Sequence, residues 1–263
     1  MQEVMSKDGT KIAFERSGGG PAVILVSGAS QDRSGNATLA EILELNFTVF
    51  NYDRRGRGDS GDARPYAVER EIEDIGAVIE EAGGGPASVF GSSSGGNLTL
   101  LAAAHGLPIL KLALWEPNFI VDDARPPLPA DYVEQINEMV ASDRRGDAVE
   151  LFMTKAAGMP AEFVAPMRTM PMWPAMEAVA HTLAYDGAIV KDDMTGNPGA
   201  IARVVSVQVP TLVMDGGTTP WMNHGAQAVA EALPNGRRRT LEGQPHNVDP
   251  DVLAPALEEF FAG

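Results

Sequence analysis

Ser93 lies at the centre of Gly91-Ser92-Ser93-Ser94-Gly95, where its hydroxyl could act as a nucleophile. An apolar, strand-like run at 87–90 precedes the pentapeptide, and a helix-like run at 97–105 follows it. A serine raised on a sharp turn between a buried strand and a helix is exposed to a substrate, and glycines two residues away on each side relieve crowding in that turn. The pentapeptide alone is a weak match, so its position between these two elements is what favours a nucleophile.

A serine hydroxyl needs a general base, and the chain has four histidines. His105 closes the helix after Ser93, His181 lies in the middle of the chain, and His224 begins a later helix. His246 lies in a loop between the last strand-like run and the last helix-like run. Where a serine is presented by such a strand–turn–helix, the chain order is serine, acid, histidine. The sequence therefore predicts His246 as the base.

The elements that must position these residues alternate along the chain. A β-hairpin is predicted around 11–16. Strands are predicted at 22–26, 47–50, 87–90, 110–115, 211–214 and 238–241, and helices at 36–45, 68–81, 97–105, 225–233 and 252–261. Such alternation predicts the α/β class, with a mostly parallel central sheet and helices on both faces.

The alternation stops between residues 118 and 205, which are rich in proline and methionine and contain no clear strand. Helical spacing recurs at 131–140 and 148–157. We therefore predict a helical cap insertion at 118–205 and a core made of 1–117 and 206–263. Methionine fills irregular gaps, so these methionines would either line a pocket for an apolar substrate or pack the cap against the core.

Composition excludes several classes of function. The formal net charge of −16 disfavours nucleic-acid and anionic-membrane partners, and the absence of cysteine excludes thiolate chemistry. No Walker loop, dinucleotide fingerprint or zinc-ligand histidine pair is present, so we expect neither a cofactor nor a metal. The first residues lack the basic and apolar regions of a signal peptide, and a cytoplasmic protein is expected.

With these residues in place, the chain resembles the α/β-hydrolase family over nearly its whole length. The segment Tyr52-Asp53-Arg54-Arg55-Gly56-Arg57-Gly58-Asp59-Ser60 is similar to the family's turn after the fourth strand, which shapes the loop beside the active site. The segment Val26-Ser27-Gly28-Ala29 is similar to its oxyanion loop, with Ser27 where histidine is more usual. The resemblance implies that the backbone N–H groups of Ala29 and Ser94 form the oxyanion hole, each contributing roughly 3–4 kcal/mol.

The acid of the triad departs from the family pattern. The family usually carries it a few residues beyond the seventh strand, where this chain has Thr219. Glu116 ends the sixth strand, and some α/β-hydrolases take their acid from that position. Asp215 ends the seventh strand, earlier than the usual geometry requires. Glu116 is the favoured acid, while Asp215 or the lack of a true acid remain open.

The nucleophile sets the expected chemistry. Family members with an aspartate nucleophile cleave alkyl halides or epoxides, whereas Ser93 implies acyl transfer to esters, lactones, thioesters or amides. The resemblance therefore implies a serine hydrolase for a small, fairly apolar ester. The alternative is a ligand-binding module of the same fold with little or no turnover.

Overall fold

A computed structural model describes residues 1–263. Its centre is an eight-stranded sheet in the order β1-β2-β4-β3-β5-β6-β7-β8. The strands are β1 (Gln2–Met5), β2 (Lys11–Gly18), β3 (Ala22–Val26), β4 (Thr48–Tyr52), β5 (Ala87–Ser92), β6 (Ile109–Trp115), β7 (Thr211–Asp215) and β8 (Gly236–Thr240). β2 is antiparallel to both of its neighbours, and the strands from β4 to β8 run parallel. The predicted fold class is therefore confirmed, including the opening hairpin.

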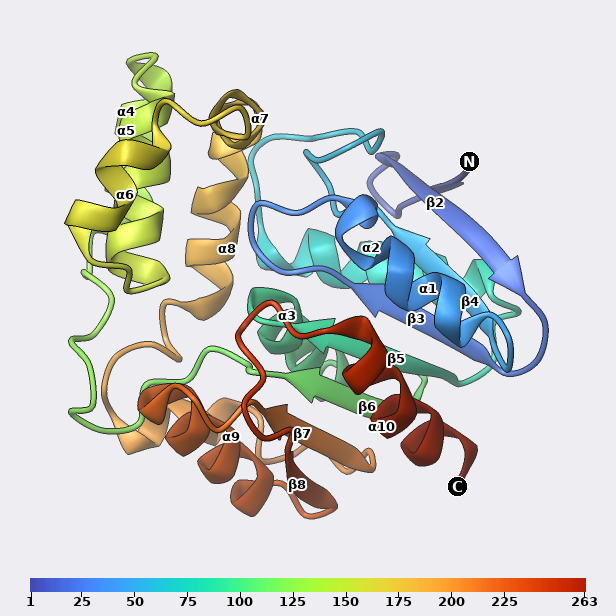
Figure 1. The fold of residues 1–263 in the computed structure, drawn as a ribbon. Coiled ribbons are helices and arrows are strands. Elements are labelled where there is room, and N and C mark those ends of the chain that lie inside the picture. Colours follow the sequence, from blue (N-terminus) through green and yellow to red (C-terminus); the bar gives the residue numbers. More distant parts are fainter.

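Ten α-helices accompany the sheet. They are α1 (Ala37–Leu43), α2 (Val68–Glu81), α3 (Ser94–Ala104), α4 (Tyr132–Ala141), α5 (Arg145–Leu151), α6 (Ala161–Met167), α7 (Trp173–Ala178), α8 (Leu183–Val190), α9 (Pro220–Ala232) and α10 (Pro250–Ala262). Figure 1 shows α1 and α10 packed together over one face of the sheet, while α4 to α8 form a group beside it. None of the helices combines the length and the apolar character needed to cross a membrane.

The side chains of β3 divide the core between the two faces of the sheet. Val23 and Leu25 pack with α1 and α10, whereas Ile24 and Val26 belong to a larger cluster with α2, α3 and α9. Successive side chains of a strand point to opposite faces, so a strand covered on both sides is apolar throughout. This explains why the run at 22–26 reads as an uninterrupted apolar segment.

The stretch between β6 and β7 contains helices and no strand, as its sequence predicts. Two of its helices, α4 and α5, lie near the predicted helical runs. α6, α7 and α8 were not predicted. Seven of the eight residues of α8 are buried, so this helix has no polar face to give it a periodic pattern. The division into a core and a cap at 118–205 stays a prediction.

The register of the sheet brings three strand ends to the same level. Ser92 of β5 is aligned with Trp115 of β6, and Trp115 is aligned with Met214 of β7. The next residues along each strand are Ser93, Glu116 and Asp215. Polar groups at the carboxyl edge of parallel strands are placed to form a site, and this is where the predicted residues lie.

Candidate active site

Ser93 occupies the turn between β5 and α3 in a strained conformation. Its backbone angles are φ 55° and ψ −128°, a conformation that residues other than glycine rarely adopt. Its N–H donates to Trp115 O of the neighbouring strand at 2.9 Å. Because that bond and the helix hold the turn from both sides, the strained serine is kept at the tip, as expected of a nucleophile elbow.

The two flanking glycines are required by close backbone contacts. A Cβ on Gly91 would lie 2.6 Å from Thr99 Oγ1, and one on Gly95 would lie 2.5 Å from Ser27 O. Both distances are far below van der Waals contact. The glycines therefore allow α3 to approach β5 and the loop after β3 closely enough to form the turn.

Glu116 lies directly after β6 and contacts His246. Its side chain is fully buried, its φ is 42°, and its Oε2 lies 2.7 Å from His246 Nδ1. Its other oxygen accepts a hydrogen bond from Gly216 N at 3.1 Å. The carbonyl of His246 in turn accepts from Trp115 Nε1 at 2.8 Å, which fixes the histidine loop against β6. Both carboxylate oxygens of Glu116 thus have partners, and the imidazole is held through Nδ1.

Asp215 has different partners. Arg238 of β8 donates to its two oxygens at 2.7 and 3.1 Å, and Gly217 N donates at 3.1 Å. Thr219, at the position where the family usually carries its acid, precedes the first residue of α9. Of the two carboxylates that the sequence left open, the structure brings Glu116 to His246 and pairs Asp215 with Arg238.

The hydroxyl of Ser93 has a partner that the sequence did not suggest. Asn118 Nδ2 donates to Ser93 Oγ at 3.1 Å, and no hydrogen bond joins Ser93 to His246 in this structure. Hydrogen bonds between a nucleophile and its base are often long before substrate binds and shorten in the complex. Because the hydroxyl accepts from Asn118, its own hydrogen remains available for His246. The only signal in the sequence is that Asn118 follows Glu116 by two residues, close to the same strand end.

Asn97 of α3 holds Asn118 in place. Asn118 N donates to Asn97 Oδ1 at 2.8 Å, and Asn97 Nδ2 donates back to Asn118 O at 3.1 Å. Asn97 Nδ2 also donates to Asp193 Oδ2 at 2.7 Å, and Arg203 donates to both oxygens of Asp193. Burial raises the pKa of Asp193 to about 6 despite its pairing with Arg203. A chain of polar contacts thus links Asn118, the hydrogen-bond partner of Ser93, to the segment after α8.

The predicted oxyanion loop lies against Ser93. A Cβ on Gly28 would lie 3.1 Å from Ser93 Cβ and 3.7 Å from its Oγ, so only glycine fits there without displacing the serine. Ala29 follows Gly28 and is half-buried, and Ser94 is the buried first residue of α3. The N–H of a first helical residue has no acceptor within its helix and lies at the positive end of the helix dipole. Both predicted donors therefore belong to backbone that borders Ser93.

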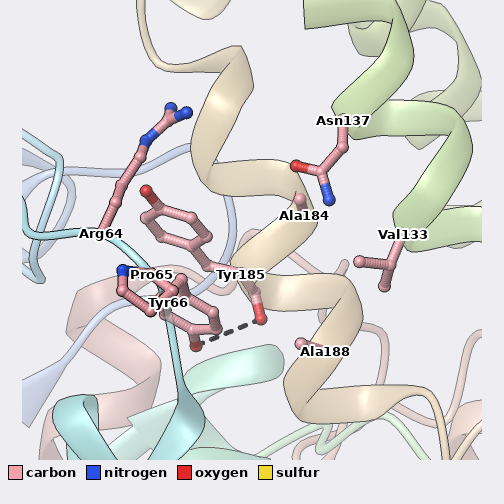
Figure 2. Close-up of a pocket in the computed structure, with 8 residues that line it drawn as sticks. All are labelled: Arg64, Pro65, Tyr66, Val133, Asn137, Ala184, Tyr185 and Ala188. Atoms are coloured by element: carbon pink, nitrogen blue, oxygen red, sulfur yellow. Dashed lines mark hydrogen bonds between the residues drawn. The ribbon is translucent and has the colours of Figure 1, made fainter. Parts of the chain in front are cut away.

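A separate cavity of about 320 Å³ lies between α4, α8 and the loop before α2. Figure 2 shows Tyr66 stacked on Tyr185 inside it, with ring centres 3.9 Å apart, and Arg64 and Asn137 at its polar walls. Neither Ser93, Glu116 nor His246 lines this cavity. Of the methionines at 118–205, Met170 and Met172 are exposed and none lines the cavity. No group of three or more His, Cys, Asp or Glu side chains is arranged to hold a metal ion.

The family of the chain follows from comparison with known proteins. A model of the alpha/beta hydrolase family matches residues 23–256, which is most of the chain. The protein belongs to the alpha/beta hydrolase family.

Individual relatives agree with this assignment. A crystal structure of an alpha/beta hydrolase from Sphaerobacter thermophilus is 57% identical, with a TM-score of 0.91 over 99% of this chain and 100% of that one. Lipase LipV of Mycobacterium tuberculosis is 31% identical over 107 residues, 40% of this chain and 39% of the lipase. An uncharacterized hydrolase of Bacillus subtilis, YraK, is 37% identical over 90 residues, 33% of each chain. The matching region therefore covers well under half of the length of each of these two relatives.

Proposed function

We propose that the protein is a serine hydrolase that cleaves a small, fairly apolar carboxylic ester through an acyl-enzyme intermediate. The observation that carries this proposal is the 2.7 Å contact between Glu116 Oε2 and His246 Nδ1, at the same sheet edge as the strained Ser93. A nucleophile, a base and a carboxylate that orients the base are the three parts that serine catalysis needs. Hydrolase activity is also in keeping with the names of the relatives, one of which is a lipase.

In the acylation half of the reaction, Ser93 Oγ attacks the carbonyl carbon of the ester. Because Glu116 binds Nδ1, the Nε2 of His246 is the nitrogen left to take the serine proton. The Glu116 carboxylate stabilises the imidazolium that forms, without being protonated itself. The backbone N–H groups of Ala29 and Ser94 donate to the carbonyl oxygen as it becomes negative. The carbon–oxygen bond of the ester then breaks, and His246 returns the proton to the departing alcohol.

The deacylation half uses the same groups with water as the nucleophile. His246 takes a proton from water, whose oxygen attacks the acyl carbon. The bond to Ser93 Oγ breaks, and the proton passes back to the serine. The carboxylic acid leaves, and the enzyme returns to its starting state. No oxidant, reductant or cofactor is needed for either half.

The alternative of a binding module without turnover arose because no acid occupies position 219. The contact between Glu116 and His246 supports the proposal that the acid comes from the end of another strand, β6. A carboxylate held against an imidazole can stabilise the imidazolium that forms when the histidine takes a serine proton, a role that ligand binding alone does not require. No observation favours the binding module in its place.

A panel of p-nitrophenyl esters of increasing acyl chain length tests the proposal. We expect hydrolysis of short to medium esters by the wild-type protein and a loss of kcat by a factor of about 10⁴ or more in Ser93→Ala. Ser92→Ala is the matched control, because it removes a neighbouring hydroxyl that makes no hydrogen bond and should keep most of the activity. Turnover that survives in Ser93→Ala, or the absence of turnover for every ester, would reject the proposal.

A further inference from the structure

Four charged side chains are buried together behind the predicted oxyanion loop. Arg54 and Arg57 come from the turn after β4, Glu71 comes from α2, and Asp186 comes from α8. The exposed fraction of each side chain is 5% or less. Glu71 accepts from Arg54 Nε and Nη2 at 2.7 and 2.9 Å. Charges removed from water this completely are costly unless they are paired, and each guanidinium group here donates to at least one carboxylate, although Arg57 Nε itself has no partner.

Asp186 is the member that connects the cluster to the site. Its Oδ1 accepts from Arg54 at 2.9 Å and from the Ser94 hydroxyl at 2.7 Å, and its Oδ2 accepts from Arg57 at 2.7 Å. Burial alone would raise the pKa of this carboxyl, but the guanidinium groups of Arg57 and Arg54 outweigh burial and hold its pKa below the ordinary value. A charged carboxylate from α8 therefore binds Ser94, the residue that carries one predicted oxyanion donor.

Arg57 reaches the other predicted donor through a peptide group. Its Nη1 donates to Gly28 O at 2.6 Å. The carbonyl of Gly28 and the N–H of Ala29 belong to the same planar trans peptide and point in opposite directions. Fixing the carbonyl therefore fixes the direction of the N–H. A charged donor on the carbonyl also polarises the amide and strengthens it as a donor.

We propose that Arg57 and Asp186 are positioning residues that orient both backbone donors of the oxyanion hole. Through Asp186, helix α8 therefore helps to set the geometry of the oxyanion hole. Asp186 fixes Ser94 directly and fixes the Gly28–Ala29 peptide through Arg57. This inference rests on the proposed function, since an oxyanion hole matters only if Ser93 forms tetrahedral intermediates. Neither residue touches the reacting atoms.

A neighbouring ion pair provides a structural control. Arg55 donates to both oxygens of Asp74 at 2.7 and 2.8 Å and to Asp8 at 3.0 Å. The side chains of Arg55 and Asp74 are as buried as the pair formed by Arg57 and Asp186. None of these bonds reaches the oxyanion loop or Ser94. If buried arginine–aspartate pairs acted only by stabilising the fold, breaking Arg55–Asp74 and breaking Arg57–Asp186 would lower kcat by similar factors.

The test compares Arg57→Lys and Asp186→Asn with the control Asp74→Asn. We would measure kcat and KM on the best p-nitrophenyl ester, the inhibition constant of an alkyl trifluoromethyl ketone, and the melting temperature. The ketone forms a tetrahedral adduct with a serine, and its oxyanion occupies the same place as that of the transition state. In the two test variants we expect kcat to fall about 10- to 1,000-fold and ketone affinity to fall in parallel, with KM changed less than about 3-fold.

The control separates positioning from stability. Asp74→Asn is expected to lower the melting temperature while leaving kcat and ketone affinity within about 3-fold of wild type. Equal losses of kcat in Asp74→Asn and Asp186→Asn, or unchanged ketone affinity in the test variants, would overturn the inference. If both test variants fail to fold, Ser94→Ala carries the test, because it removes the 2.7 Å bond to Asp186 and the longer 3.4 Å bond from Arg54 while leaving the ion pairs of the cluster in place. A loss of about 10-fold in kcat and ketone affinity supports the inference, and no loss overturns it.

Failure of the proposed function has a different signature. In that case the wild-type protein itself would neither hydrolyse the esters nor bind the ketone, and the inference would fall with the function. If the wild type is active and the Arg57 and Asp186 variants keep its kcat and ketone affinity, the inference is rejected while the proposed function stands.

Discussion

At the scale of single residues, the strain in the site is concentrated at two strand ends. Ser93 and Glu116 both have positive φ values, 55° and 42°, and each follows the last residue of a central strand. Conformations of this kind cost on the order of 1–3 kcal/mol and persist only where the surrounding structure imposes them. They place the serine hydroxyl and the carboxylate on the same side of the sheet edge, where His246 can bind between them.

Replacing the proposed acid tests its role. Glu116→Gln keeps the shape of the side chain but removes the charge that would stabilise an imidazolium, so kcat should fall by a factor of about 10⁴. Asp215→Asn is the matched control, since that carboxylate ends the adjacent strand but pairs with Arg238. Its kcat should stay within about 3-fold of wild type even if stability drops. If steady-state kinetics show a larger loss of kcat in Asp215→Asn than in Glu116→Gln, Asp215 at the end of β7 would be the acid instead.

Part of the site could be predicted from residue types and their order. The glycine spacing around Ser93 and the late position of His246 identify a serine and a base. The sequence favours Glu116 as the acid but leaves Asp215 open, because both residues end neighbouring strands and the difference depends on Arg238, which reaches Asp215 from β8. Asn118 was missed because an asparagine after a proline matches no catalytic pattern.

At the scale of elements, apolar runs predicted the strands well because both faces of the sheet are covered. The helices α6 to α8 could not be predicted, since prolines interrupt the segment and α8 is buried on nearly every side. The helix predicted at 225–233 begins earlier, at Pro220, which is favoured in the first helical turn because its missing N–H would have no partner there.

Asp193, in the segment after α8, should make stability depend on pH. Asp193 has its pKa raised by burial from 3.8 to about 6, so between those values the folded protein binds a proton that the unfolded chain releases. The stability that this group contributes is therefore highest below about pH 4 and is lost as the pH rises through 6. Relative to Asp193→Asn, the wild type should lose roughly 2–3 kcal/mol between pH 4 and 7.

Urea unfolding of both proteins across this pH range checks that difference. Asp123→Asn is the control, because Asp123 is exposed and forms no ion pair with this segment, and its stability should follow that of the wild type across the range. A wild type that gains stability relative to Asp193→Asn as the pH rises through 6 would contradict the assignment of the shift to burial.

At the scale of the whole molecule, the helices between β6 and β7 are joined to the rest of the chain by buried polar contacts. Asp186 pairs with Arg54 and Arg57, and Asp193 accepts from Asn97 of α3. Apolar side chains of α4, α5 and α8 also belong to the same core cluster as those of α2 and α3. Separating this segment from the sheet would return these apolar side chains to water, so we expect the segment to stay packed against the sheet.

We therefore expect the segment and the sheet to unfold in one transition. In the double variant W115F/W221F, the remaining Trp173 reports on α7 alone, while far-ultraviolet circular dichroism reports on the whole chain. The urea midpoints of the two signals should coincide. A Trp173 midpoint at clearly lower urea would show that the segment opens on its own and that its buried contacts are weak.

We propose above that Ser93 is a nucleophile activated by His246 and Glu116. The most direct measurement is covalent labelling of the folded protein with a fluorophosphonate probe, followed by mass spectrometry of the digested protein. We expect one label per chain, located on Ser93, with labelling strongly slowed in His246→Ala and Glu116→Gln. Absence of label on the folded protein, or a label on any other residue, would contradict it.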